Sequence, residues 1–185
     1  MLSRPDIQKG SNAIINGGVI CYPTEGVFGL GCLPEADYAV ARILEFKNRH
    51  PEQGLILIAA NLEQLEPWIM PNSTELDSLI STTSKPTTWV IKSSSRTPEW
   101  VTGGRDTIAV RLCRHPVARE LCLQTSSALI STSTNRSGRP AAITSINARY
   151  RTRHIVDAFV SGTCSPLIGS SEIRIANTGE VIRES

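Results

Sequence analysis

The sequence has no apolar segment long enough to cross a membrane. A spanning helix needs about 20 consecutive apolar residues, and no run in these 185 residues approaches that length. The first residues, MLSRPDIQKGSN, also lack the apolar centre of a signal peptide. We therefore expect a cytoplasmic protein that does not associate with membranes.

Cysteines and aromatic residues are few and scattered. The five cysteines are odd in number and show no C-x-x-C spacing, which argues against a zinc site or a disulfide framework and predicts reduced, mostly buried thiols. Phe, Tyr and Trp occur three times each and form no cluster typical of a surface that stacks RNA bases. Neither feature favours a secreted scaffold or a base-stacking RNA module.

The usual motifs of phosphate-binding proteins and hydrolases are absent as well. There is no G-x-x-x-x-G-K-[ST] loop, and no G-x-G-x-x-G follows a predicted strand. The G-x-S-x-G elbow of many hydrolases is missing, and the three histidines lie far apart in the sequence. If this protein binds a nucleotide, it must do so with other residues.

The composition is typical of one globular domain. With 40% hydrophobic and 19% charged residues the chain can bury a substantial core, and its length fits a single domain over residues 1–185. The net charge of +2 implies no particular partner. Residues 136–154, however, carry five arginines and no acid, so this segment is either a solvated basic face or a surface for the phosphates of a nucleotide or of RNA.

Apolar periodicity and turn residues predict helices and strands that alternate along the chain. The expected helices are residues 7–16, 35–48, 61–68, 73–80 and 115–125. The expected strands are residues 19–22, 54–60, 87–92, 107–113, 128–132, 154–160, 173–176 and 180–183, the last two joined by a turn at 177–179. This order, without repeats, predicts an α/β fold with one twisted mixed sheet and flanking helices.

Four polar groups stand at the ends of these elements, where open α/β sheets place their ligand sites. They are Thr24-Glu25, Lys47 with Arg49, Arg111, and the run STSTN at 131–135. We expect Lys47 and Arg49 in a solvent-reachable loop, where they suit a phosphate, although a K-x-R pair at a helix end also simply favours the helix dipole. The STSTN run can equally be a polar loop, and a buried Arg111 needs an anion that is either a structural carboxylate or a ligand.

Together these motifs resemble the YrdC/Sua5 family, in its short bacterial TsaC (RimN) type. YPTE-x-VFGLG, K-x-R, an apolar strand, P-x-T, AVR and S-T-S-x-N-x-SG-x-P follow one another in the family's order. The closing SEIRIANTGEVIRES is similar to the family's terminal hairpin, so the resemblance covers about residues 10–185. It implies the family fold, a twisted α/β sheet around a basic concave cavity.

The resemblance implies a threonylcarbamoyl-AMP synthase, a nucleotidyltransferase that makes L-threonylcarbamoyladenylate and pyrophosphate from L-threonine, bicarbonate and ATP. The product serves the N6-threonylcarbamoyl modification of adenosine in tRNAs that read codons beginning with A, and the proteins that complete this modification are expected partners. Mg²⁺ would arrive with ATP rather than in a protein cage, and no organic cofactor is expected. The resemblance leaves tRNA or double-stranded RNA open as a further partner.

The resemblance also implies roles for individual side chains. ATP would contact Lys47, Arg49, Thr107, Ser133, Asn135 and Arg183, with Gln53 and Ala141 as further matches. Threonine would contact Thr24, Arg111, Ser131 and Ser171, with its carboxylate on Arg111. Glu25 would join Thr24 in the cavity wall, and Gly26, Gly29 and Gly31 would let the backbone approach the ligand closely. No side chain is assigned as a general base.

Some positions depart from the family pattern, and two other functions stay open at this point. The departures that concern the threonine pocket are Gly26, Gly54, Ile58 and SKPTT at 84–88. A double-stranded RNA-binding or ribosome maturation factor could use the basic concave surface together with residues 136–154. A hydrolase of a carbamoyl or nucleotide compound could use the same cavity.

Overall fold

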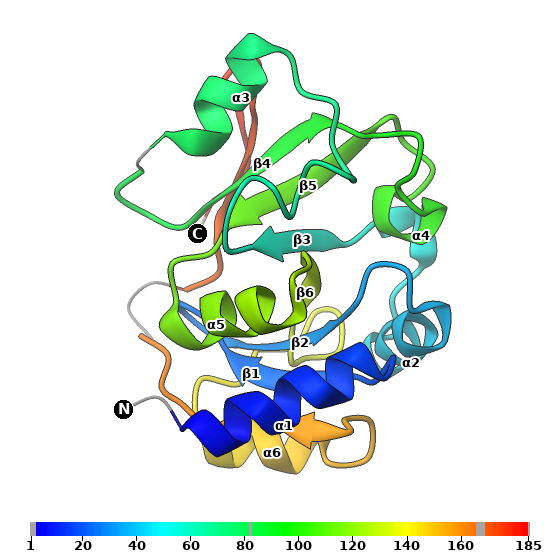
Figure 1. Ribbon diagram of the computed structural model, residues 1–185, viewed down its shortest axis with the longest axis vertical. Coiled ribbons are helices and arrows are strands. Elements are labelled where there is room, and N and C mark those ends of the chain that lie inside the picture. The colour runs from blue at the N-terminus through cyan, green and yellow to red at the C-terminus, as the bar shows by residue number, and fades with distance from the viewer. Residues whose placement is uncertain (1–2, 82, 166–168, 185) are drawn as a thin grey trace.

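One nine-stranded mixed sheet runs through the part of the chain that the computed structural model describes, residues 3–81, 83–165 and 169–184. The strands lie in the order β7-β1-β2-β6-β3-β5-β4-β8-β9 (Figure 1). Their bounds are β1 Ile20–Pro23, β2 Phe28–Cys32, β3 Ile56–Ala59, β4 Thr87–Lys92, β5 Thr107–Leu112, β6 Leu129–Ser133, β7 Ala158–Phe159, β8 Glu172–Ile175 and β9 Val181–Arg183. Three neighbouring pairs are parallel, namely β1 with β7, β3 with β5 and β4 with β8, and the others are antiparallel.

The helices flank this sheet, as Figure 1 shows. They are α1 Arg4–Ile15, α2 Asp37–Lys47, α3 Ser73–Ile80, α4 Glu99–Thr102, α5 Pro116–Thr125 and α6 Ser145–Thr152, and a short 3-10 turn covers Pro51–Gln53. The predicted α/β class with a mixed sheet and flanking helices is thus confirmed. Within the described residues, none of the helices is long and apolar enough to span a membrane.

The central strands have a hydrophobic core on each face of the sheet. Their side chains alternate between these two cores. Leu129 of β6 packs in one core with residues of α1 and α5, whereas its neighbour Ile130 packs in the other core with Val40 and Ile43 of α2. Side chains two residues apart on a strand share a face. Ser131 therefore lies on the same face of β6 as Leu129. Its side chain lines a large cavity at this end of the strand.

The end of α2 is shaped by a left-handed residue. Asn48 closes the helix with φ 49°, a conformation that asparagine tolerates better than most residues. The chain therefore turns sharply after Lys47, and Arg49 leaves the helix axis. This turn places the two cations of the K-x-R motif at one edge of the same cavity.

Several predicted elements differ from the structure. The helix expected at 61–68 is wrong: the segment forms turns, in which Asn61 Oδ1 accepts the N–H of Gln64, and Pro67 has no N–H to continue a helix. The strand expected at 154–160 shortens to Ala158–Phe159. Strand β2 and helices α4 and α6 were not predicted. Strand β2 was not expected because its sequence is rich in glycine.

Glycine in β2 allows close packing rather than a loop. A Cβ added at Gly31 would lie 2.8 Å from the carbonyl oxygen of Ile130 and 2.8 Å from the Tyr22 ring. The small residue thus lets β2 fit between β1 and β6 while Tyr22 crosses over it. Four of the five cysteines are buried and Cys164 is partly buried, which agrees with the prediction that most of them are buried.

Candidate active site

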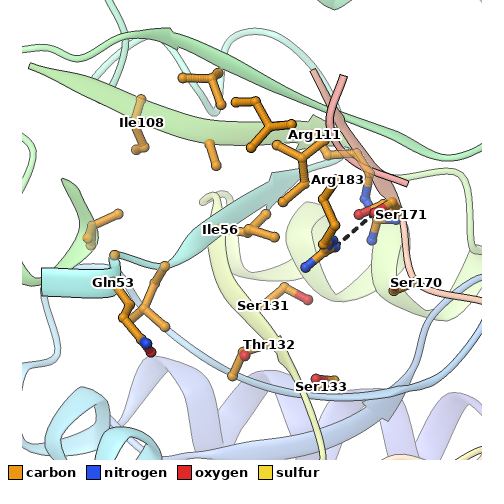
Figure 2. Close-up of a pocket in the computed structure, with 18 of the residues that line it drawn as sticks. Gln53, Ile56, Ile108, Arg111, Ser131, Thr132, Ser133, Ser170, Ser171 and Arg183 are labelled. Carbon is orange, nitrogen blue, oxygen red and sulfur yellow. Dashed lines mark hydrogen bonds between the residues drawn. The ribbon is translucent and has the colours of Figure 1, made fainter. Parts of the chain in front are cut away.

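A cavity of about 870 Å³ opens between the central strands and the C-terminal hairpin (Figure 2). All ten side chains predicted to bind ATP or threonine line it: Thr24, Lys47, Arg49, Thr107, Arg111, Ser131, Ser133, Asn135, Ser171 and Arg183. Gln53 lines it too, whereas Ala141 is not among the lining residues. Segments that are far apart in the sequence therefore meet around one hollow.

Lys47 holds the loop that follows β6. Its Nζ donates hydrogen bonds to the carbonyl oxygens of Ser133 at 2.6 Å and of Asn135 at 2.9 Å. The expectation of a solvent-reachable loop is wrong for this residue, which lies in the last turn of α2 and is only 3% exposed. An ammonium group has three N–H donors, so one remains for a ligand. Burial and the nearby charge of Arg49 lower the pKa of Lys47 to about 8.

Three further guanidinium groups line the cavity. Arg49 donates to the carbonyl oxygen of Gly54 at 2.8 Å, Arg105 to that of Glu52 at 2.8 Å, and Arg183 to that of Ser171 at 2.8 Å. Burial and the charges of Arg183 and Arg105 lower the pKa of Arg49. Arginines placed this close to one another favour a bound polyanion, because it offsets their mutual repulsion.

Asn135 shapes the loop beyond β6. Its side-chain amide donates to the carbonyl oxygens of Arg136 at 3.0 Å and Arg139 at 2.5 Å. The N–H of Ser137 in turn donates to the carbonyl oxygen of Lys47 at 2.9 Å. The loop and the end of α2 are therefore tied together in both directions, which fixes the relative positions of Lys47 and Ser133.

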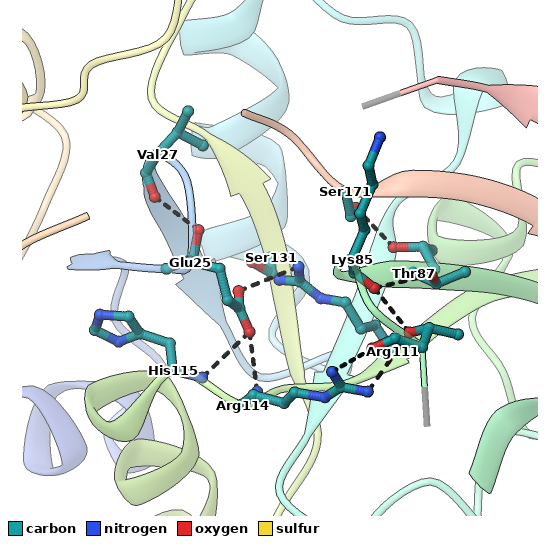
Figure 3. A network of polar contacts seen from close by, with 12 residues as sticks. Glu25, Val27, Lys85, Thr87, Arg111, Arg114, His115, Ser131 and Ser171 are labelled. Atoms are coloured by element: carbon teal, nitrogen blue, oxygen red, sulfur yellow. Dashed lines mark hydrogen bonds and ion pairs between the residues drawn. The ribbon is translucent and has the colours of Figure 1, made fainter. Parts of the chain in front are cut away.

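A second group of polar side chains lies toward β5 and β8. Ser131 Oγ accepts a hydrogen bond from the Tyr22 hydroxyl at 2.8 Å, and the hydroxyls of Ser171 and Thr88 are 2.8 Å apart. Arg111, which is buried, pairs with a carboxylate of the protein, since its Nη1 lies 3.2 Å from Glu25 Oε2 (Figure 3). The structure thus answers the open question about the anion of Arg111.

Glu25 does not take the place that the sequence predicted for it. Thr24 lines the large cavity, but Glu25 does not, and it lines a separate hollow of about 180 Å³ instead. The reason is local geometry: the Thr24 hydroxyl donates to the carbonyl oxygen of Val27 at 2.7 Å, and this turn directs the next side chain toward the start of α5. The expectation that Glu25 belongs to the cavity wall is therefore corrected.

The charged side chains that line the cavity are mainly cationic. Lys47, Arg49, Arg105, Arg111 and Arg183 contribute positive charge, and Glu75 is the one carboxylate among the described lining residues. Both oxygens of Glu75 accept hydrogen bonds, from the N–H groups of Asn72 and Lys92 and from the amide of Asn177. Within the described residues there is no group of three His, Cys, Asp or Glu side chains that could hold a metal ion.

The side chains of the five arginines in residues 136–154 do not line this cavity. Arg149 stacks on the ring of Phe159 at 4.2 Å, and Arg153 stacks on that of Tyr150 at 4.6 Å. Both therefore serve at least in part to cover aromatic rings on and near α6.

The comparison with protein families covers nearly the whole chain. The family model Sua5/YciO/YrdC, described as telomere recombination, matches residues 12–185. The chain belongs to this family. The resemblance inferred from the motifs is thereby confirmed.

Relatives within the Sua5/YciO/YrdC family are similar over their full lengths. A Pseudomonas aeruginosa protein named threonylcarbamoyl-AMP synthase is 43% identical over 99% of both chains, and one of the same name from Vibrio cholerae is 41% identical over 97% of both. The crystal structure of P. abyssi Sua5 complexed with L-threonine matches with a TM-score of 0.82 and 30% identity, covering 90% of this chain and 49% of that chain. This likeness extends from the sequence to the fold.

Two residues of the site, Arg105 and Gly26, are not among the motif positions that the sequence assigns to a ligand. Arg105 lies in a Gly-Gly-Arg turn before β5, and only its basic charge next to a strand could have drawn attention to it. Gly26 lies directly against the backbone of Gly169, so that an added Cβ would clash with the Gly169 carbonyl oxygen. In this chain the absence of a side chain at 26 thus lets the segment before β8 close onto the cavity.

Proposed function

We propose that this protein is a threonylcarbamoyl-AMP synthase, which forms L-threonylcarbamoyladenylate and pyrophosphate from L-threonine, bicarbonate and ATP. The observation that carries the proposal is one cavity in which Lys47, Arg49 and Arg183 suit a triphosphate while Arg111 and Ser131 suit a small amino acid. The names of the full-length relatives support the same activity.

The reaction proceeds in two steps. The amine of threonine attacks carbon dioxide or bicarbonate to form a carbamate, with loss of water in the case of bicarbonate. A carbamate oxygen then attacks the α-phosphorus of ATP, a new P–O bond forms, and the bond to pyrophosphate breaks. Lys47, Arg49 and Arg183 stabilise the charge on the departing pyrophosphate, and holding the reactants together supplies much of the acceleration.

Mg²⁺ enters this scheme with the nucleotide. The carboxylate that lines the cavity, Glu75, already accepts hydrogen bonds at both oxygens, so it is poorly placed to serve as a ligand. Mg²⁺ commonly keeps several waters and binds substrate phosphates. In our proposal the phosphates of ATP would therefore bring the ion, which would neutralise part of their charge, while Lys47, Arg49 and Arg183 would hold the phosphates.

The product points to further partners and to a compartment. An acyl adenylate is reactive, and its threonylcarbamoyl group is transferred to N6 of adenosine in tRNA. We therefore propose that the proteins that complete this modification receive the adenylate, and that this happens in the cytoplasm. Double-stranded RNA binding as the main function is not favoured, because the full-length relatives are named as synthases.

Pyrophosphate release tests the proposed function directly. The purified protein is incubated with MgATP, bicarbonate and labelled L-threonine, and pyrophosphate and the labelled adenylate are measured. Release that requires both threonine and bicarbonate supports the synthase. Pyrophosphate or phosphate formed at the same rate without threonine would instead show a nucleotide hydrolase.

Replacing Arg105 with alanine is expected to raise the KM for ATP by about tenfold, the typical effect of removing one charge-assisted contact. The KM for threonine should change little, because Arg105 belongs to the guanidinium cluster around Arg49. The matched control is Arg119→Ala, which removes an exposed arginine of α5 outside the cavity. Equal kinetics for Arg105→Ala and Arg119→Ala would remove Arg105 from the ATP site.

ATP binding is expected to weaken as the pH rises above 8. The pKa of Lys47 is lowered to about 8, so its charge is present below that pH and is lost above it. If the charged amine is required, affinity falls by up to about tenfold between pH 7 and 9, and ATP binding takes up a proton in that range. Calorimetric titration with ATP across this range measures both effects. In Lys47→Met the affinity should be lower and independent of pH, whereas an equally steep curve in this variant would assign the titration to another group.

A further inference from the structure

Glu25 and Arg111 form a buried ion pair in the wall between two hollows. Their side chains are 10% and 9% exposed. Arg111 lines the large cavity, whereas Glu25 lines the smaller hollow behind it, together with Thr87, Cys113 and Arg114. Figure 3 shows the carboxylate of Glu25 beside the guanidinium of Arg111.

The carboxylate of Glu25 is itself rigidly held. Its Oε1 accepts the backbone N–H groups of Arg114 at 2.9 Å and His115 at 3.2 Å, which immediately precede α5. Burial pushes the pKa of Glu25 upward, but the charge of Arg111 and these N–H donors outweigh it and bring the pKa below its ordinary value. Glu25 is thus a fixed anion, and Oε2 is the oxygen that it presents to Arg111.

Arg111 keeps hydrogen-bonding capacity after this pairing. A guanidinium has five N–H donors arranged in a planar fork, which can bind two anions on different edges. The pair with Glu25 involves Nη1. Because Arg111 also lines the large cavity, a carboxylate that enters from that side can accept from N–H groups of the guanidinium that this pair leaves free.

We propose that Glu25 is a positioning residue, which holds Arg111 in the orientation that binds the carboxylate of the amino-acid substrate. The proposal rests on the function proposed above, because it assumes that threonine is that substrate. Two consequences follow from the arrangement. Glu25 neutralises the buried cation while the cavity is empty, and it prevents the long arginine side chain from turning toward Ser171 or the phosphates.

The test is the variant Glu25→Gln. The carbonyl oxygen of glutamine can still accept both backbone N–H groups, but its amide N–H then faces the N–H of Arg111, so the attraction is lost. We expect the dissociation constant for L-threonine to rise by about tenfold, while the KM for ATP stays close to wild type. The melting temperature should fall, because the buried Arg111 loses its counter-charge. Glu45→Gln, an exposed site on α2 outside the cavity, is the matched control.

A second ligand separates positioning from general damage to the fold. L-threoninamide lacks the carboxylate, so its affinity should differ little between wild type and Glu25→Gln, and the preference of wild type for threonine over threoninamide should shrink in the variant. Glu25→Asp keeps the charge but has a shorter side chain. Its dissociation constant for L-threonine should therefore lie between those of wild type and Glu25→Gln.

The outcomes are distinguishable. If wild type neither binds threonine nor releases threonine-dependent pyrophosphate, the proposed function fails, and this inference fails with it. If wild type is active but Glu25→Gln binds threonine as tightly as wild type, or more tightly, the positioning role alone is overturned. Equal losses for threonine, threoninamide and ATP would make Glu25 a residue of the fold and also overturn it.

Discussion

Lys47→Met is expected to lower threonine-dependent pyrophosphate release by about a hundredfold or more. Removing one preorganised donor from a charged transition state typically costs 10²–10³ in rate, and this substitution has two effects. It removes a positive charge from the phosphate end of the cavity, and it frees the carbonyl oxygens of Ser133 and Asn135 that the amine holds. Methionine fills much of the volume of the lysine stem, so the buried end of α2 should remain packed.

The control for this prediction is Lys9→Met on the exposed side of α1, which should leave the kinetics unchanged. Steady-state rates and the melting temperature of both variants are measured together. Because Lys47 is buried rather than in an open loop, we expect a modest loss of stability in Lys47→Met alongside the kinetic effect. A variant with more than half of the wild-type activity would contradict the role of Lys47 in phosphate binding.

Arg111→Met is expected to abolish activity and to lower the free energy of unfolding by about 3–5 kcal/mol. Removing one member of a buried ion pair leaves the other charge without compensation, and that magnitude is typical. Here the orphaned group would be Glu25, which the backbone N–H groups of Arg114 and His115 hold in place. Chemical denaturation measures the stability, and the pyrophosphate assay measures the activity.

The double variant Glu25→Gln/Arg111→Met separates these two effects. With both charges removed, most of the lost stability should return, because neutral residues of similar size commonly replace a buried pair without cost. Activity should not return, because the group that binds the carboxylate is still missing. If the double variant is as unstable as Arg111→Met, the ion pair is not the cause of the instability, and recovery of activity would exclude Arg111 from threonine binding.

The parts of the site that motifs carry were predictable from the sequence. Lys47, Arg49 and Ser133 stand at or near the ends of a helix and a strand whose apolar periodicity is clear, and the family resemblance implied that they share one site. The hairpin of β8 and β9 was also predictable, because Asn-Thr-Gly is a typical turn sequence. In the structure Gly179 adopts φ 73° in this turn. In these places the local sequence pattern was sufficient to predict the structure.

Other parts depend on contacts that no local pattern encodes. The burial of Lys47 follows from carbonyl groups more than 80 residues away. The pairing of Glu25 with Arg111 joins the turn between β1 and β2 to strand β5, which is far away in the sequence. The strand Phe28–Cys32 was missed because its glycines argue against a strand until the ring of Tyr22 is placed against them. Tertiary packing decided each of these cases.

The position of the C-terminal hairpin has a consequence for synthesis of the protein. Ser171 and Arg183 complete the cavity, and β8 reaches it by pairing with β4, more than 80 residues earlier. A nascent polypeptide therefore carries most of its core before β8 and β9 supply this side of the hollow. A ligand that needs Ser171 and Arg183 can stabilise only chains in which both strands have been synthesised.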